Sequence, residues 1–294
     1  MKKRKGDSRI GMVALILLCA ALVIAIAWGL RQAVIKLKQY AENSLIYSEE
    51  TGTQTPDETE QEPSAEKVLP RNTYKSGGFY EENGIRFYKT DTVIGRAGMD
   101  VSAYQSSIDW QQVKEAGIEF AMIRLGYRGY STGKLDLDDC FLKHMDGALE
   151  AGLDVGVYFF SQALTPEEAV EEAEYVINWL EGYDITYPVA YDWEEVEGPA
   201  RTDEMNMLNL TACAKAFCDR IAEAGYEASI YFNQAYGYEQ LNLVSLRDYE
   251  FWLAEYAPSP TFAYDFTMWQ YTNEGTVPGI SGPVDMNIRF EKAE

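Results

Sequence analysis

Apolar and polar positions alternate regularly through the C-terminal two thirds of the chain. The pattern is clearest over residues 166–180, where apolar side chains recur every three or four positions and make one helical stripe. Thr165 and Glu168 form a capping box before this stripe, and Pro166 suits the first helical position. Residues 141–149 carry a second stripe. Both segments are predicted to be amphipathic helices.

Short apolar, β-prone runs predict eight strands. They cover residues 98–101, 120–125, 155–160, 188–193, 228–232, 251–254, 266–269 and 284–288. Glu-Ala-Gly or Glu-Gly junctions separate several amphipathic stretches from the next apolar run, as expected where a helix C-cap leads into a strand. This alternation indicates parallel βα units that close into a barrel.

The end of the chain departs from that alternation. Residues 254–266 and 269–284 contain proline and glycine but no helical stripe. The segment 98–294 holds about 200 residues, the lower limit for such barrels. We therefore predict an α/β fold, a modified TIM-like (β/α) barrel of eight strands over 98–294 whose last helices are missing. Residues 79–97 precede it, and Asn83-Gly84 predicts a β-hairpin extension that forms a lid or brace.

The N-terminal segment predicts a membrane anchor. Residues 1–9 are basic, and the uncharged run 10–30 is long enough to cross a ~30 Å hydrocarbon core as a transmembrane helix. The positive-inside rule places the basic tail in the cytoplasm and the barrel outside, in a single-pass cell-membrane protein. Ala25-Ile26-Ala27 resembles a cleavage site, so secretion after signal cleavage is the alternative. Residues 31–78 are predicted to be a juxtamembrane segment and a disordered acidic linker.

Charge and composition argue against a nucleic-acid partner, a histidine-activated nucleophile and a structural disulfide. The net charge of −22 argues against a nucleic-acid partner. His144, the single histidine, lies in a predicted helix away from the strand ends, so a histidine-activated nucleophile is not expected. Cys213 and Cys218 are five apart on one predicted helix and poorly placed to pair, so we predict no structural disulfide.

The run Tyr191-Asp192-Trp193-Glu194 is the strongest candidate for chemistry. Because side chains alternate along a strand, Asp192 and Glu194 should face one side and Trp193 the other. Two neighbouring carboxylates raise each other's pKa, which prepares a carboxylic acid that is still protonated near neutral pH. A solvated acidic turn is the plainer alternative.

Other polar residues fall at the predicted strand ends, where the active sites of such barrels lie. The full set is Asp100, Arg124, Tyr158, Asp192, Glu194, Tyr231, Trp269, Gln270 and Asp285. Since the first and eighth strands are neighbours in a closed barrel, Asp100 and Asp285 should lie close together. Four carboxylates on one rim could instead hold Ca²⁺ or Mg²⁺, but nothing resembles a metal-binding loop, so we expect no metal and no cofactor.

Several of these motifs also carry a family resemblance. They are Gly98-Met99-Asp100-Val101-Ser102, Asp109-Trp110, Val157-Tyr158-Phe159-Phe160, Tyr191-Asp192-Trp193-Glu194, Trp269-Gln270-Tyr271 and Val284-Asp285-Met286-Asn287. Together they resemble the glycoside hydrolase family 25 lysozymes, in order over about 98–290. The resemblance implies hydrolysis of the β-1,4 bond between N-acetylmuramic acid and N-acetylglucosamine in peptidoglycan.

The resemblance also implies roles for the site residues. Glu194 matches the general acid of the family, and Asp192, Asp100 and Asp285 match its other acidic positions. Tyr158, Tyr231 and Trp269 resemble sugar-contacting aromatics, although each could be a core residue, and we group Arg124 and Gln270 with them as substrate-binding. No cell-wall-binding repeats follow the barrel, and the predicted anchor would take their place.

Two function classes follow. The first is a membrane-anchored muramidase with a monomeric catalytic domain, whose partners are peptidoglycan glycan strands and, through one helix, the membrane. The second is a non-catalytic glycan-binding module or scaffold on the same fold. The four carboxylates favour the enzyme, because a degenerate binder would be free to lose them. Whether Asp192 attacks the sugar or assists its N-acetyl group is left open.

The anchor is testable at the N-terminus of the mature protein. If residues 10–30 remain as a membrane helix, mass spectrometry of the purified protein should detect the N-terminal segment. A mature chain that starts at Trp28 would contradict the anchor and support secretion.

Overall fold

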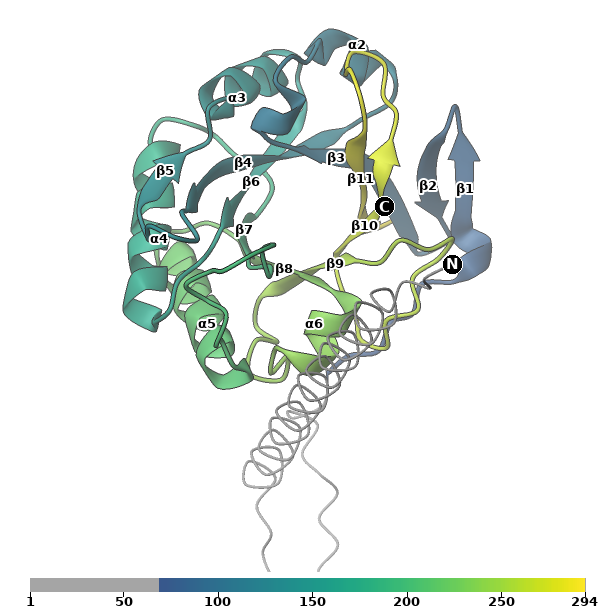
Figure 1. Cartoon of the computed structure of the whole chain (residues 1–294). Helices are drawn as coiled ribbons and strands as arrows, with labels where there is room; N and C mark the ends of the chain where they lie inside the picture. The colour runs from purple at the N-terminus through teal and green to yellow at the C-terminus, as the bar shows by residue number, and fades with distance from the viewer. Residues whose placement is uncertain (1–68, 294) are drawn as a thin grey trace, which may run out of the picture. The chain divides into compact units, whose positions relative to one another are not determined.

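The computed structural model describes residues 69–293 (Figure 1). The basic tail, the apolar run 10–30 and most of the linker 31–78 lie outside these residues. Within 69–293, no helix has both the length and the apolar character needed to span a bilayer. The anchor therefore stays a prediction from sequence.

Eight strands close into a barrel around a central axis (Figure 1). In order around the barrel they are β3 (Val93–Val101), β4 (Phe120–Arg128), β6 (Asp154–Phe160), β7 (Val189–Asp192), β8 (Ala228–Asn233), β9 (Glu250–Ala254), β10 (Met268–Gly275) and β11 (Val284–Lys292), which returns to β3. The short strand β5 (Leu135–Leu137) pairs with the outer end of β4. The predicted eight-stranded barrel is confirmed.

In the part of the chain that the structure describes, α-helices follow the strands as far as β8, and none follows β9 or β10. They are α2 (Trp110–Glu115), α3 (Phe141–Glu150), α4 (Pro166–Leu180), α5 (Met207–Glu223) and the short α6 (Gln234–Glu239). Helix α4 begins as predicted, because the Thr165 side chain accepts the Glu168 N–H and the Glu168 carboxylate accepts the Leu164 N–H. Between β9 and β11 the described chain forms no α-helix, in agreement with the sequence pattern.

The direction of β11 corrects the expectation of parallel βα units. β11 pairs antiparallel with both β10 and β3, whereas the other neighbouring pairs of the barrel are parallel. A parallel return needs a crossover of about a dozen residues or more, usually a helix. β10 extends to Gly275, and the short segment 276–283 leaves no room for one. β11 therefore starts at the mouth where the other strands end, which is why Asp285 lies there.

A hairpin extends the barrel sheet on the side that lacks helices. Strands β1 (Phe79–Glu82) and β2 (Ile85–Lys89) are joined at Asn83 and Gly84, which have φ of 54° and 81°, as a two-residue hairpin turn requires. β2 pairs with β3, which begins at Val93 instead of the expected 98. The hairpin is thus a brace built into the sheet.

Aromatic side chains fill the lower barrel and fix the position of the mouth. Phe120, Met122, Tyr187, Ala190, Trp252 and Met268 form an interior cluster. The rings of Phe120 and Tyr187 stack with centroids 4.6 Å apart. Gly98 allows this packing, because a Cβ at this position would lie 2.3 Å from the Phe120 ring. The polar site therefore occupies the upper barrel alone.

This packing predicts that Gly98→Ala destabilises the barrel. The added methyl would overpack a fully buried ring, at a cost of about 1–3 kcal/mol in the free energy of unfolding. Gly77→Ala is the matched control, because a Cβ there would meet nothing within 4 Å. Denaturant unfolding of both variants provides the measurement, and equal midpoints would contradict the packing argument.

Candidate active site

A cavity of about 830 Å³ opens at the carboxyl ends of the parallel strands. Eight of the nine residues expected from sequence line it, namely Asp100, Arg124, Tyr158, Asp192, Glu194, Tyr231, Gln270 and Asp285. They come from strands on all sides of the barrel and from the loop after β7. The cavity lies where active sites of such barrels are found.

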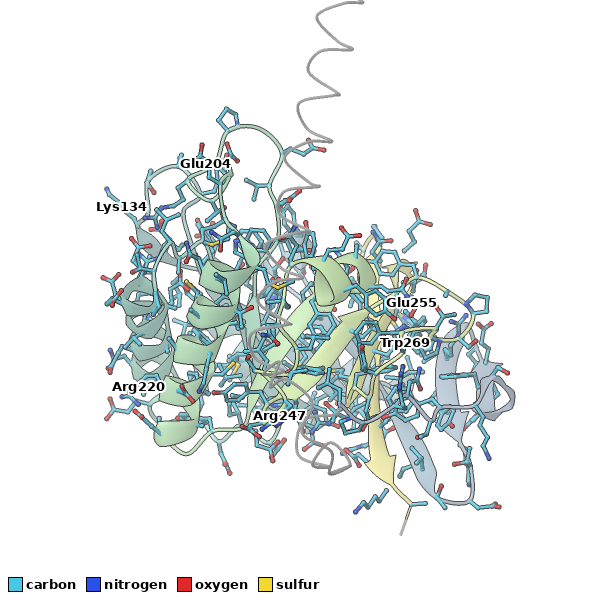
Figure 2. The ribbon with its side chains drawn as sticks, turned by 90° about the horizontal axis from the view of Figure 1, so that it is seen from below. Lys134, Glu204, Arg220, Arg247, Glu255 and Trp269 are labelled. Atoms are coloured by element: carbon cyan, nitrogen blue, oxygen red, sulfur yellow. The ribbon has the colours of Figure 1, made fainter. Side chains whose placement is uncertain are left out.

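Trp269 is the exception: it belongs to the cluster that packs outside the barrel interior, and it lies close to Glu255 (Figure 2). It is fully buried, its ring is 5.1 Å from that of Phe79 in the hairpin, and its Nε1 donates to the Glu255 carbonyl at 2.9 Å. Adjacent residues of a strand face opposite sides, and here Gln270 faces inward. The expectation that Trp269 contacts sugar is therefore not met. Trp252 occupies an inner position instead, with its ring 4.9 Å from that of Tyr231.

Asp192 and Glu194 face the same side, as predicted, although β7 ends at Asp192 and Glu194 lies in the loop that follows. Both residues line the cavity, while Trp193 packs outside against Tyr236, with ring centroids 5.5 Å apart. Burial, followed by the charges of Glu194 and Asp100, raises the pKa of Asp192 well above its ordinary value. The buried Oδ1 atom of Asp192 has no hydrogen-bond partner among the described residues. It is a buried acceptor that the described chain leaves unpaired.

Asp100 lies opposite Asp285 in the β3–β11 register, so the expected proximity is confirmed. One oxygen, Oδ2, accepts two hydrogen bonds of 2.8 Å, from Gln270 Nε2 and from Asn287 Nδ2. Burial and the charge of Asp285 raise the pKa of Asp100, while the two amide bonds act in the opposite direction. Asp100 is thus held by two neutral amide donors, which do not neutralise the negative charges of the neighbouring carboxylates.

Each of those amides is itself held in one orientation. Gln270 Oε1 accepts from the hydroxyls of Tyr231 and Tyr256, both at 3.0 Å, which turns Nε2 toward Asp100. Asn287 Oδ1 accepts from Trp252 Nε1 at 2.8 Å. The sequence interpretation missed Trp252, Tyr256 and Asn287. Asn287 follows Asp285 by two positions on one strand and could have been found by alternation, whereas Tyr256 lies in a loop that carries no such signal.

The loop that carries Glu194 is held by the segment that follows β6. Gln162 is fully buried, its Nε2 donates to the Glu194 carbonyl at 3.1 Å, and its Oε1 accepts from the Thr202 hydroxyl at 2.7 Å. The Ser161 N–H donates to the Asp192 carbonyl at 2.7 Å. Burial and the charge of Asp285 raise the pKa of Glu194, and burial raises the pKa of Asp285 to about 6.

The two arginines that line the cavity are already paired. Arg124 binds the buried Asp138 through Nε at 2.8 Å and through a terminal nitrogen at 2.7 Å. Arg128 binds the buried Glu172 through Nε at 2.7 Å. The four carboxylates therefore dominate the charge of the mouth. Among the residues that the structure describes, no group of three or more His, Cys, Asp and Glu is arranged to hold a metal ion.

A carboxylic acid with a raised pKa beside other carboxyl groups, in a long open cavity, can donate a proton to a leaving group and stabilise positive charge. The chain is also similar in sequence to known lysozymes. The autolytic lysozyme of Clostridium acetobutylicum is 28% identical over 191 residues, 65% of this chain and 54% of its own length. Lysozyme M1 of Streptomyces globisporus is 28% identical over 244 residues, 76% of this chain and 80% of its own.

Among solved structures, the modular autolysin LytC from Streptococcus pneumoniae superposes with a TM-score of 0.60 at 22% identity, which speaks for the fold alone. That match covers 73% of this chain and 52% of LytC. This chain therefore spans about half the length of LytC and about half the length of the clostridial lysozyme. The profile of the glycosyl hydrolases family 25 matches residues 99–280, more than half of the chain. The protein is a member of glycosyl hydrolases family 25.

Proposed function

We propose that this protein is a peptidoglycan hydrolase that cleaves the β-1,4 bond between N-acetylmuramic acid and N-acetylglucosamine, with Glu194 as the general acid. The observation that carries the proposal is the position of Glu194 in the cavity, where burial and Asp285 raise its pKa. A raised pKa keeps the acid protonated at a pH at which an ordinary glutamate has lost its proton. The lysozyme names of the relatives support the choice of substrate.

Asp192 has a different role from Glu194. Asp192 ends β7 and Glu194 follows it by two residues in the next loop, so the two are only about 7 Å apart along the chain and approach the sugar from one side. A nucleophile should instead face the acid across the ring. We therefore infer substrate assistance, in which the N-acetyl group of the muramic acid attacks the anomeric carbon. Asp192 Oδ1, a buried acceptor without a partner in the described chain, would accept the acetamido N–H and orient that group.

Asp100, Asp285 and the tyrosines at the rim of the cavity have the remaining roles. Asp100 and Asp285 would stabilise the positive charge that develops on the sugar. Tyrosines line the outer cavity, and Tyr104 is 86% exposed, with the Arg124 guanidinium 5.4 Å from its ring centroid. Exposed rings of this kind offer an apolar face to a sugar and a polar edge to water. Substrate binding is thus assigned to the rim, and proton transfer to Glu194.

The setting of the reaction is the second part of the proposal. The basic tail and the run 10–30 support a single-pass anchor with a cytoplasmic N-terminus, so that the barrel acts on the wall outside the cell, as a monomeric domain. Secretion after cleavage is the alternative location. A non-catalytic glycan-binding module is the alternative function, and loss of turbidity of purified wall sacculi separates it from the enzyme.

Replacement of the proposed acid tests the assignment directly. Glu194→Gln should lower the rate of sacculus hydrolysis by about 10²–10⁴-fold, because the amide cannot donate the proton, while glycan binding is retained. Glu195→Gln is the matched control on the neighbouring exposed residue and should act at the rate of the unmodified protein. Equal rates for the two variants would remove Glu194 from the mechanism.

The pH profile tests the electrostatics of the mouth. Because the pKa of Glu194 is raised, its active, protonated form should persist to higher pH, and kcat/KM should fall as the pH rises through that pKa. Asp285→Asn removes the charge that raises this pKa, so the alkaline limb should move to lower pH. Glu195→Gln again serves as the control. An alkaline limb that stays in place in Asp285→Asn would contradict the coupling.

A further inference from the structure

A second groove of about 790 Å³ lies beside the catalytic cavity, between the tip of the β1–β2 hairpin and the outer end of β10. Its walls include Glu81 and Asn83 from the hairpin and Thr272 and Glu274 from β10. Tyr256 lines both this hairpin groove and the catalytic cavity. The two spaces therefore adjoin at one side chain.

The walls of the hairpin groove are fixed relative to each other by Arg86. Its terminal nitrogens donate to the Ala257 carbonyl at 2.8 Å and to Glu81 at 2.9 Å. Its guanidinium carbon lies 4.8 Å from the centroid of the Tyr271 ring, whose hydroxyl accepts the Arg86 N–H. One residue thus joins the hairpin, the loop after β9 and β10, so the groove is held open in a defined shape.

Tyr256 is suited to guide a chain from one space to the other. The residue is 55% exposed, yet its hydroxyl is held by Gln270 at 3.0 Å. An aromatic ring that is fixed at its polar end and open on its face offers a platform to a sugar ring. The bond to Gln270 also links this platform to Asp100.

The chemistry of the groove favours sugar over charged peptide. Its side chains offer amide, hydroxyl and carboxylate groups, which accept hydrogen bonds from hydroxyls and acetamido N–H groups. Arg86 is the cation of the described lining, and it is already bound to Glu81 and Ala257. The exposed carboxylate Glu274, for which no ion pair is formed within the described residues, would repel the acidic groups of a stem peptide.

We propose that the hairpin groove is a glycan subsite that holds sugars of the same strand beyond those in the catalytic cavity. The inference rests on the proposed function and extends it, because it predicts a preference for long chains. The hairpin lies outside residues 99–280, the part that matches the family profile. The subsite is therefore built partly by the hairpin and partly by residues of β10 and of the loop after β9, which lie within that match.

The test measures binding, so that it does not depend on turnover. The probes are neutral β-1,4-linked N-acetylglucosamine oligomers, a tetramer and an octamer, which carry neither lactyl groups nor peptide. They are titrated calorimetrically into the full-length Glu194→Gln protein. The octamer should bind about tenfold more tightly than the tetramer, as expected for about two additional hydrogen bonds.

The double substitution Asn83→Gly/Glu274→Ala should remove that gain and leave tetramer binding unchanged. Glycine suits the positive φ of 54° at position 83, so the hairpin turn is preserved. Glu82→Ala is the matched control, since Glu82 is exposed on the same hairpin and does not line the groove. It should keep the full preference for the octamer.

Three results would overturn the subsite. They are equal affinities for the two oligomers, a gain that survives the double substitution, and displacement of the octamer by free stem peptide, which would assign the groove to peptide. Hydrolysis of sacculi by the unmodified protein is measured separately. Its absence would count against the proposed function, while the length dependence of binding decides the subsite.

Discussion

Repulsion among four carboxyl groups in one partly desolvated mouth is the constraint on which this structure depends. A cation placed among them would relieve the repulsion, but both arginines of the cavity are bound to buried carboxylates of their own. The barrel uses neutral donors instead. Asp100 is held by two amides, and each amide is oriented by an aromatic hydroxyl or indole N–H. Asp100 is thereby positioned, while the carboxyls continue to raise one another's pKa.

The sequence predicted those parts of the fold that depend on local pattern. The capping box at Thr165 and the apolar stripe that follows define α4. Asp192 at the end of β7 and Glu194 in the next loop line the same cavity, as the spacing of two residues predicted. The direction of β11 was not predictable in this way. The apolar run at 266–269 predicts a short strand, whereas β10 continues through polar residues to Gly275. Only this continuation shows how short the connection from β10 to β11 is.

The site was predicted least well where partners are distant in sequence. Gln162 and Thr202 meet across 40 positions to hold the Glu194 loop, and Tyr256 reaches Gln270 from a loop without periodicity. Trp269 shows a related limit, because the type of a residue does not tell on which side of the barrel wall its side chain lies. Its alternation with Gln270 requires one of the two to face outward, but only the hairpin that covers the outer wall determines which. In place of the missing helices, that hairpin seals the wall and, in the proposal above, lengthens the binding surface.

The antiparallel course of β11 also determines where the described chain enters and leaves the barrel. β11 descends from the mouth, so that Lys292 lies beside Val93 at the start of β3. Arg71 bridges to Tyr264, and Leu69 lies near the lower end of β9. Both ends therefore lie at the base, opposite the carboxylates. A surface to which the barrel is joined through residue 69 or residue 293 would therefore meet its base, and the carboxylates would face away from that surface.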